Sequence, residues 1–169
     1  EQYFLELVNR ARMNPAGEAA KYGIGLNDGL SSGQSISSSP KQVLAGNTYL
    51  NASATAHSSW MIAEDVFSHT GSGGSSPTDR MTSHGYSLSG TWRTGENIAW
   101  TSWSSIDSHH ENLFKSAGHR ANILGEGFRE LGIGSVNGNY DGWSGALMTT
   151  QNFAASGTGV FVTGVAYRD

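Results

Sequence analysis

GENI at residues 95–98, SAGHRANIL at residues 116–124 and TQNF at residues 150–153 are three polar motifs embedded in apolar sequence. An earlier motif, FSHTG at residues 67–71, adds a histidine. Because the motifs are far apart in the chain and each has apolar neighbours, we expect their side chains to meet at one site. The alternative, in which each motif decorates a separate surface, fits their apolar surroundings less well.

The first two thirds of the chain carry the apolar spacing of amphipathic helices. Residues 48–65 place Leu50, Ala54, His57 and Met61 on one helical face. His57 is therefore expected to be a buried, hydrogen-bonded core residue, with a ligand role as the alternative. We predict helices at residues 3–12, 16–21, 48–65, from Pro77 until Gly85, and 104–115, and a long Gly- and Ser-rich loop at residues 23–46 with one helical turn after Pro40.

The last third of the sequence changes to β-branched and alternating stretches, which predict strands at residues 130–134, 146–153 and 159–167. The pairs Asn-Gly at 137–138 and Asp-Gly at 141–142 predict the turns of an antiparallel meander. Helices followed by strands indicate an α+β fold. We find neither an internal repeat nor a linker, so residues 1–169 are expected to form a single domain.

Composition excludes several classes of protein. The formal net charge is -4 and the lysines and arginines form no basic stripe, so a nucleic-acid partner is not expected. No run of 18 apolar residues is present, so no transmembrane segment is predicted. The 169 residues include no cysteine, so disulfides and thiolate metal sites are impossible.

Three residues of the polar motifs are candidates for chemistry. His69 follows a predicted helix in a glycine-rich segment, where its ring either reaches into a cleft or remains exposed. Glu96 lies beside Ile98 and Trp100, and a carboxylate in apolar surroundings requires a partner, which could be a histidine, a metal ion or a backbone amide. His119 could be a ligand or a proton carrier, since histidine titrates near neutral pH.

The neighbouring basic residues have structural alternatives. Arg120 either belongs to the site or clamps a carboxylate or carbonyl group. His109 and His110 are adjacent on a predicted helix, so their side chains point about 100° apart. His110 shares a face with Leu113 and is expected to point inward, whereas His109 is expected to be a solvated surface residue.

Several motifs of known catalytic sites are missing from the sequence. There is no His-Glu-x-x-His of zinc peptidases, no Gly-x-Ser-x-Gly nucleophile elbow, no Walker phosphate loop and no EF-hand. The remaining cluster of histidines and a carboxylate has no evident nucleophile. It indicates a divalent-cation site or a polar pocket more than a hydrolase centre.

Taken in order, the motifs at residues 67–69, 95–98, 118–124, 131–134 and 150–153 resemble those of the CAP superfamily, the cysteine-rich secretory and pathogenesis-related group. The closer resemblance is to the bacterial branch, which lacks cysteines. It implies an α-β-α sandwich with a central, mostly antiparallel sheet. It also implies secretion, and a groove with two histidines and two acidic residues that holds zinc or another divalent ion in some members.

Carried over by position, the resemblance implies that His69 is the first groove histidine and Glu96 the first groove acid. The position of the second acid is occupied by Ser116, with Glu111 five residues earlier, and the position of the second histidine by Met148. The resemblance then implies His119 as the replacement histidine. We predict His69, Glu96 and His119 as metal ligands, or as catalytic residues if the protein is an enzyme, and a groove lined by His69, Glu96, His110, His119, Arg120 and Gln151.

Three functions follow from these predictions. The leading hypothesis is a secreted, monomeric bacterial protein whose groove binds a divalent ion or a small-molecule, lipid or protein ligand without turnover. The first alternative is a metal-assisted hydrolase, such as a peptidase, with Glu96 as general base. The second is an extracellular adhesion module with a purely structural polar cluster. No organic cofactor is expected, and the chain is expected to be a fragment, or the mature N-terminal part, of a longer secreted protein.

Overall fold

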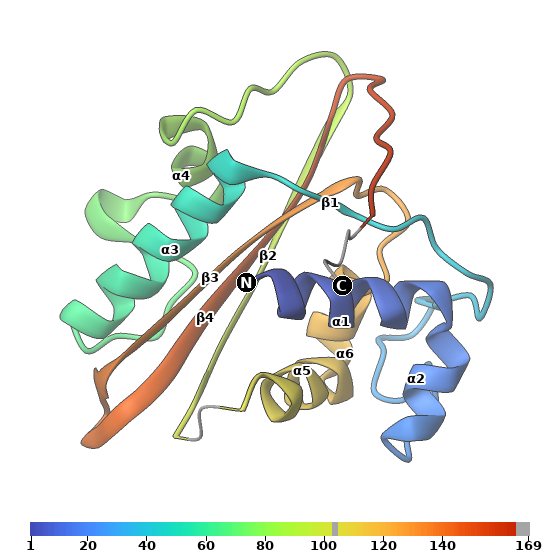
Figure 1. Ribbon diagram of the computed structural model, residues 1–169, viewed down its shortest axis with the longest axis horizontal. Coiled ribbons are helices and arrows are strands. Elements are labelled where there is room, and N and C mark those ends of the chain that lie inside the picture. Colours follow the sequence, from blue (N-terminus) through green and yellow to red (C-terminus); the bar gives the residue numbers. More distant parts are fainter. Residues whose placement is uncertain (103–104, 165–169) are drawn as a thin grey trace, which may run out of the picture.

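The computed structural model describes residues 1–102 and 105–164 of the chain (Figure 1). Side-chain caps explain where several of the helices begin, because Asn14, Asn47, Ser76 and Ser105 each accept a hydrogen bond from a backbone N–H of the first turn. In chain order the elements are α1 (Gln2–Met13), α2 (Pro15–Lys21), β1 (Ala45–Gly46), α3 (Thr48–Ala63), the 3₁₀ turn η1 (Ser72–Gly74), α4 (Pro77–Ser83), β2 (Trp92–Thr101), α5 (Ile106–Lys115), α6 (Ala117–Ile123), β3 (Glu130–Tyr140) and β4 (Trp143–Ser156).

The strands form a four-stranded sheet in the order β1-β3-β4-β2. β4 pairs antiparallel with both β3 and β2, and the short β1 pairs parallel with β3. The long strand β2 therefore lies at one edge of the sheet, where its outer side remains open to neighbouring segments. Its register with β4 places Glu96 opposite Asn152 and Asn97 opposite Gln151.

Helices cover both faces of this sheet. In Figure 1, α3 and α4 lie on one side of the strands, and α1, α5 and α6 lie on the other. A large core that includes Phe4, Phe114 and Phe153 fills the second side. Two smaller cores, around Leu50 and Met81 and around Met61 and Met148, lie under α3. The predicted α-β-α sandwich with a mostly antiparallel sheet is confirmed.

Glycines allow α3 to lie directly on β3. A Cβ atom on Gly134 would lie 2.1 Å from the backbone nitrogen of Thr55, and one on Gly132 would lie 2.1 Å from the carbonyl carbon of Leu50. These contacts are with the helix backbone, which cannot rotate away as a side chain can. The alternation of glycine with Leu131 and Ile133 therefore gives β3 one flat face for α3 and one apolar face for the opposite core.

The strand and loop predictions were wrong in several places. Asn137 and Gly138 form no turn but lie inside β3, where Gly138 makes room for Ile62. The other predicted turn is correct, because the chain reverses at Asp141 and Gly142, both with positive φ. No helical turn follows Pro40. Residues 159–164 form no strand, and the rest of that predicted strand, like Ser104 of the predicted helix, lies outside the described residues.

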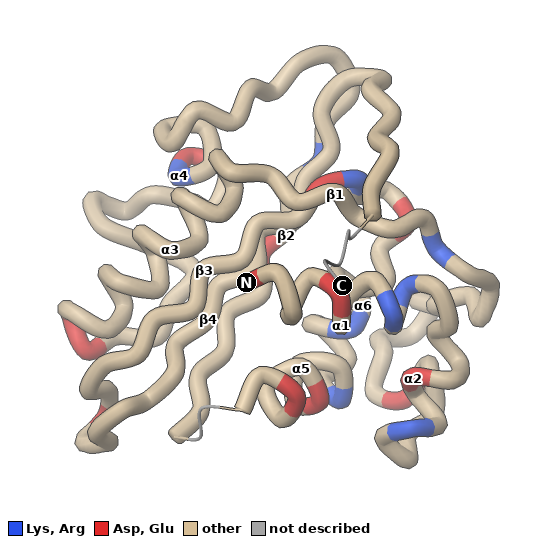
Figure 2. The backbone as a smooth tube through the Cα atoms, in the orientation of Figure 1, with Lys and Arg blue, Asp and Glu red and all other residues tan. Residues whose placement is uncertain are grey.

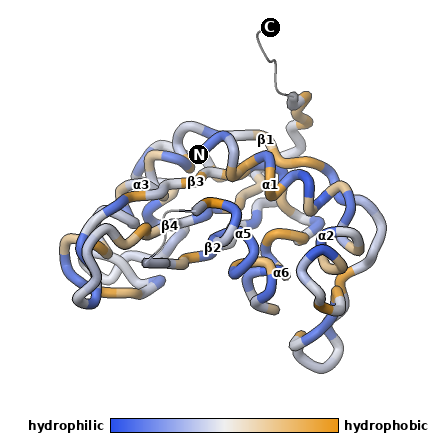
Figure 3. Tube along the Cα trace, turned by 60° about the horizontal axis from the view of Figure 1, so that its bottom comes forward, coloured by the Kyte–Doolittle hydropathy of each residue, from blue (hydrophilic) through white to orange (hydrophobic). Residues whose placement is uncertain are grey.

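Within residues 1–102 and 105–164, no helix has both the length and the apolar character needed to cross a membrane. Figure 3 shows how short the hydrophobic stretches are along the chain.

Candidate functional site

His69 and Glu96 form a hydrogen-bonded pair at the open edge of the sheet. Nδ1 of His69 lies 2.8 Å from Oε1 of Glu96, and the guanidinium of Arg80 donates to the other oxygen, Oε2, at 2.6 Å. The Glu96 side chain is only 1% exposed, whereas the His69 side chain is 54% exposed. The carboxylate is thus buried and neutralised, and it fixes a histidine ring whose Nε2 is left for other contacts.

Arg80 also holds the loop that carries His69. Its NH1 donates to the backbone carbonyl of His69 at 3.0 Å and to that of Ser75 at 2.8 Å. Arg80 comes from α4, which begins with a capping box between Ser76 and Asp79. One buried guanidinium therefore joins α4, the loop after α3 and the carboxylate on β2.

His119 approaches the same edge from the opposite helical layer. Asn97 on β2 donates to the His119 carbonyl at 3.2 Å, and Asn122 donates to the Glu96 carbonyl at 3.1 Å, so that α6 is tied to β2. Burial, and then the charge of His69, lowers the pKa of His119. The two imidazoles are therefore close enough to interact electrostatically, and the His119 ring is neutral at pH 7.

A groove of about 240 Å³ runs beside His119 along β2. Its apolar lining comes from Phe67, Ile98, Ala99, Trp100 and Leu113. Its polar lining comes from His109, Asn112, Ser116 and His119. The groove thus lies between the loop after α3 on one side and helices α5 and α6 on the other, with the edge strand as its floor.

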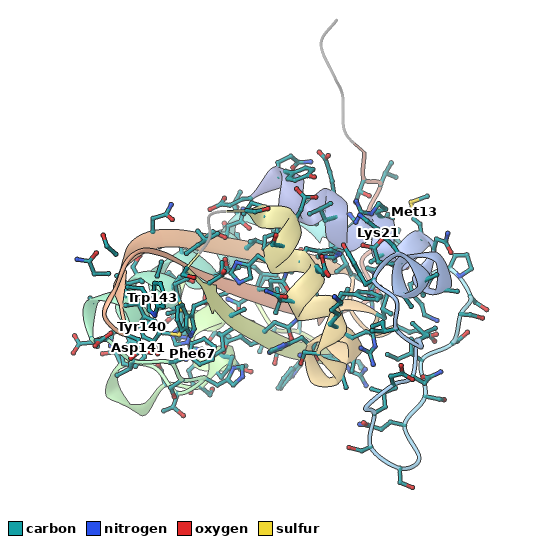
Figure 4. The ribbon with its side chains drawn as sticks, turned by 90° about the horizontal axis from the view of Figure 1, so that it is seen from below. Met13, Lys21, Phe67, Tyr140, Asp141 and Trp143 are labelled. Atoms are coloured by element: carbon teal, nitrogen blue, oxygen red, sulfur yellow. The ribbon has the colours of Figure 1, made fainter. Side chains whose placement is uncertain are left out.

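One of the groove residues, Phe67, lies at an aromatic and acidic end of the molecule. Figure 4 shows Phe67 at the same end as Tyr140, Asp141 and Trp143, and the rings of Trp100 and Tyr140 lie 5.0 Å apart. Figure 2 shows acidic but no basic residues around the tip of the β3–β4 hairpin. The electrostatic environment there favours neutral or cationic ligands over anions.

Two larger hollows lie away from these histidines. One, of about 530 Å³, lies beside the Lys41–Glu126 ion pair, and the other, of about 740 Å³, lies between α1 and residues 162–164. We place the candidate site in the smaller groove because polar groups and perturbed histidines converge there, and size alone does not identify a functional pocket.

The prediction that His109 is a solvated surface residue was wrong. Its side chain is buried, with 1% of the residue exposed, and it lines the groove. Helix α5 lies in the angle between α1 and β2, so two of its faces are covered instead of one. Burial lowers the pKa of His109 to about 4, and the nearby Ala99 carbonyl offsets this only in part. Helical periodicity gives no signal for a second covered face.

Of the six predicted groove residues, His119 alone lines this groove. His69 and Glu96 pair with each other at the same edge strand, and His110, Arg120 and Gln151 lie elsewhere. His110 is fully buried and lies 3.1 Å from a carboxylate oxygen of Glu18, on the far side of α5. Arg120 is also fully buried, and its guanidinium donates to the backbone carbonyls of Leu26, Asp28, Phe114 and Lys115. It is the structural clamp of the alternative interpretation, because the surrounding carbonyls satisfy nearly all of its donors.

Gln151 and the two family positions that differ in this chain also have clear locations. The Gln151 side chain is buried behind β2, where Oε1 accepts a hydrogen bond from Asn97 at 3.0 Å. Ser116 lines the groove, whereas Met148 is buried in the core with Met61. Glu111 pairs with Lys115 on the outer surface of α5 and does not replace the missing acid.

The α-β-α sandwich, with the His69–Glu96 pair at its edge strand, has the architecture of a CAP, or SCP, domain. Residues 5–153 match the CAP family, described as the cysteine-rich secretory protein family. The chain belongs to this family. It has no cysteine, which agrees with the predicted cysteine-free branch.

Solved structures resemble this chain to different degrees. An extracellular protein containing an SCP domain from Bacillus anthracis is 30% identical over 67% of this chain and 34% of its own, with a TM-score of 0.55. This chain therefore spans about a third of that protein. Two further structures share the fold. An outer surface protein from Borrelia burgdorferi is 13% identical over 66% of this chain and 78% of its own, with a TM-score of 0.54. BmVAL-1 is 12% identical over 94% of this chain and 78% of its own, with a TM-score of 0.52. No curated protein matches the sequence.

Proposed function

We propose that this CAP domain is a secreted bacterial module whose groove holds a divalent ion between His69 and His119 and binds its ligand without turnover. The observation that supports it is the His69–Glu96 pair. Metal-binding histidines typically donate their second ring N–H to a carboxylate, which fixes the tautomer and directs the free nitrogen to the metal. Glu96 accepts in this way from Nδ1 of His69, so Nε2 is the nitrogen available to an ion.

The fit of these residues to a metal ion is partial. Within residues 1–102 and 105–164, no three His, Asp or Glu side chains are arranged to hold a metal ion. Both oxygens of Glu96 already accept hydrogen bonds, so Glu96 would orient His69 instead of being the third ligand that the sequence predicts. The lowered pKa of His119 favours the neutral imidazole that metal binding requires. Water or ligand oxygen atoms would complete the coordination.

A bound ion would supply a Lewis acid that fixes a ligand oxygen in the groove. The protein would position that ligand between Phe67 and Leu113. We propose no turnover because Glu96 is a poor general base. Arg80 lies 2.6 Å from one of its oxygens and His69 lies 2.8 Å from the other, so neither oxygen is left to accept a proton from a substrate water.

The secreted location rests on relatives. The Bacillus anthracis protein with an SCP domain is extracellular, and the matched family carries "secretory" in its description. Since this chain spans only a third of that relative, the ligand and the partners of the whole protein are part of the proposal.

Zinc titration tests the proposed ion. We expect the wild-type domain to bind one zinc ion per chain in isothermal titration calorimetry. His69→Ala and His119→Ala should each weaken binding at least about tenfold, since each removes half of the protein ligands. The control is His84→Ala, because His84 contacts the Arg80 carbonyl outside the groove. Equal, weak binding by all four proteins would contradict the proposal.

Replacing Glu96 with glutamine separates the three hypotheses. Loss of the carboxylate leaves the Arg80 guanidinium buried without its counter-charge, so we expect a loss of stability of about 3 kcal/mol or more. It also releases the His69 ring, so zinc affinity should fall about tenfold or more. Thermal unfolding and calorimetry measure the two effects. If the cluster is purely structural, Glu96→Gln should lower the stability of the domain and leave ligand binding intact. If the protein is a hydrolase, the wild type should cleave peptides in a chelator-sensitive way, and Glu96→Gln should abolish that cleavage.

A further inference from the structure

His109 is a buried polar side chain that leaves at least one ring nitrogen without a hydrogen-bond partner. The residue is 1% exposed, and no protein group forms a hydrogen bond of normal geometry with either ring nitrogen. Buried polar groups almost always have partners, because a lost hydrogen bond to water costs about 1–3 kcal/mol. The exception here lines the groove along β2, so the missing partner can come from a molecule that enters the groove.

The neighbouring histidine on the same helix shows what a structural histidine looks like in this fold. His110 lies deeper and contacts the Glu18 carboxylate, which Arg10 also neutralises. His109 has no carboxylate partner, and its ring packs against Phe4 at 6.0 Å, between planes tilted by 51°. A phenylalanine at position 109 would make that contact without leaving polar atoms unsatisfied. Packing alone therefore does not explain an imidazole at this position.

The surroundings of His109 define the chemistry of the missing partner. Apolar side chains, including Ile98, Trp100 and Leu113, provide the rest of the groove wall. The Ala99 carbonyl lies near the imidazole and favours the tautomer whose N–H points toward it. The other ring nitrogen then carries a lone pair and can only accept. A complementary molecule is apolar, with one O–H or N–H group.

We propose that the groove binds a small apolar molecule through a hydroxyl or N–H group that donates to His109. The volume of about 240 Å³ is below the range of about 300–1,000 Å³ for drug-sized ligands, so the bound part is about the size of one aromatic ring. This names the ligand class of the groove in the proposed function. It requires no metal ion, because His109 is separate from the His69–Glu96 pair.

Three matched probes test the hydrogen bond. In the wild-type domain we expect p-cresol, which can donate, to bind about tenfold more tightly than toluene or 4-methylanisole, which cannot. A factor of ten corresponds to about 1.4 kcal/mol, which is the magnitude expected for satisfying one buried acceptor. Dissociation constants are measured by NMR titration. In His109→Phe the three probes should bind within about twofold of one another.

Equal affinities for the three probes in the wild type would overturn the inference, as would an unchanged preference for p-cresol in His109→Phe. If the variant does not fold, the ¹⁵N shifts of the wild-type His109 ring decide. These shifts should change when p-cresol is added and remain unchanged when 4-methylanisole is added. Shifts that change with 4-methylanisole but not with p-cresol would exclude the hydrogen bond. Zinc calorimetry on His109→Phe distinguishes the two proposals, because zinc binding should be retained whether or not the probe preference is lost.

Discussion

Replacing Gly134 with alanine is expected to destabilise the protein by at least about 3 kcal/mol. The new Cβ would lie 2.1–2.4 Å from backbone atoms of Ala54 and Thr55, so either α3 or β3 must shift. Overpacking of a core typically costs about 1–3 kcal/mol, and a clash with helix backbone belongs at the upper end or above it. In a domain of this size, such a loss lowers the melting temperature by about 10 °C.

The matched control for this substitution is Gly118→Ala. Gly118 lies in α6, and no atom within 4 Å would meet an added Cβ. Alanine also has the higher helix propensity, so this variant should be as stable as the wild type or slightly more stable. Urea unfolding of both variants gives the comparison. Equal stability of the two would mean that α3 does not lie on β3 as closely as described.

Acid is expected to unfold the domain through its buried histidines. Burial, and then the charge of Arg80, lowers the pKa of His57 to about 4, and burial lowers that of His109 to a similar value. In the unfolded chain both titrate near 6.5. Between pH 6.5 and 4 the unfolded state therefore binds more protons, and stability falls as the pH falls. Together the two histidines should lower the free energy of unfolding by on the order of several kcal/mol between pH 7 and pH 4.

His57→Gln separates one histidine from the rest. In this variant the free energy of unfolding should depend less steeply on pH, by about 1.4 kcal/mol per pH unit in the steepest range, because one titrating proton is removed. The measurement is urea unfolding at pH 7, 6, 5 and 4. Glu18 acts only at lower pH. Burial alone would raise its pKa, but hydrogen bonds from His110 and Arg10 lower it to about 2. A stability independent of pH above 4 would contradict the buried neutral histidines.

The sequence contains enough information to predict the layers of the fold and which motifs meet at the edge strand. The motifs that carry Glu96 and His119 lie side by side, because strand β2 and helix α6 are joined by side-chain amide hydrogen bonds within those motifs. Asn97 and Asn122, which make these contacts, belong to GENI and SAGHRANIL. The predicted metal role of the three residues stays a prediction.

The remaining features depend on contacts between distant parts of the chain. The position of His109 requires knowing that α1 covers a second face of α5. The Asn137-Gly138 pair has the composition of a turn, but Gly138 serves the packing of Ile62 and stays inside the strand. Likewise, two of the four carbonyls around Arg120 come from the loop after α2 and two from the end of α5. No local sequence pattern predicts these contacts.

The connections made by Arg80 have a kinetic consequence. Because one guanidinium joins the carboxylate of Glu96 to the carbonyls of His69 and Ser75, the loop beside the groove is already in its final position before a ligand arrives. Encounter should then lead to capture without a slow rearrangement. Association should follow a single exponential whose rate rises linearly with ligand concentration, and residence time should set the differences among ligands.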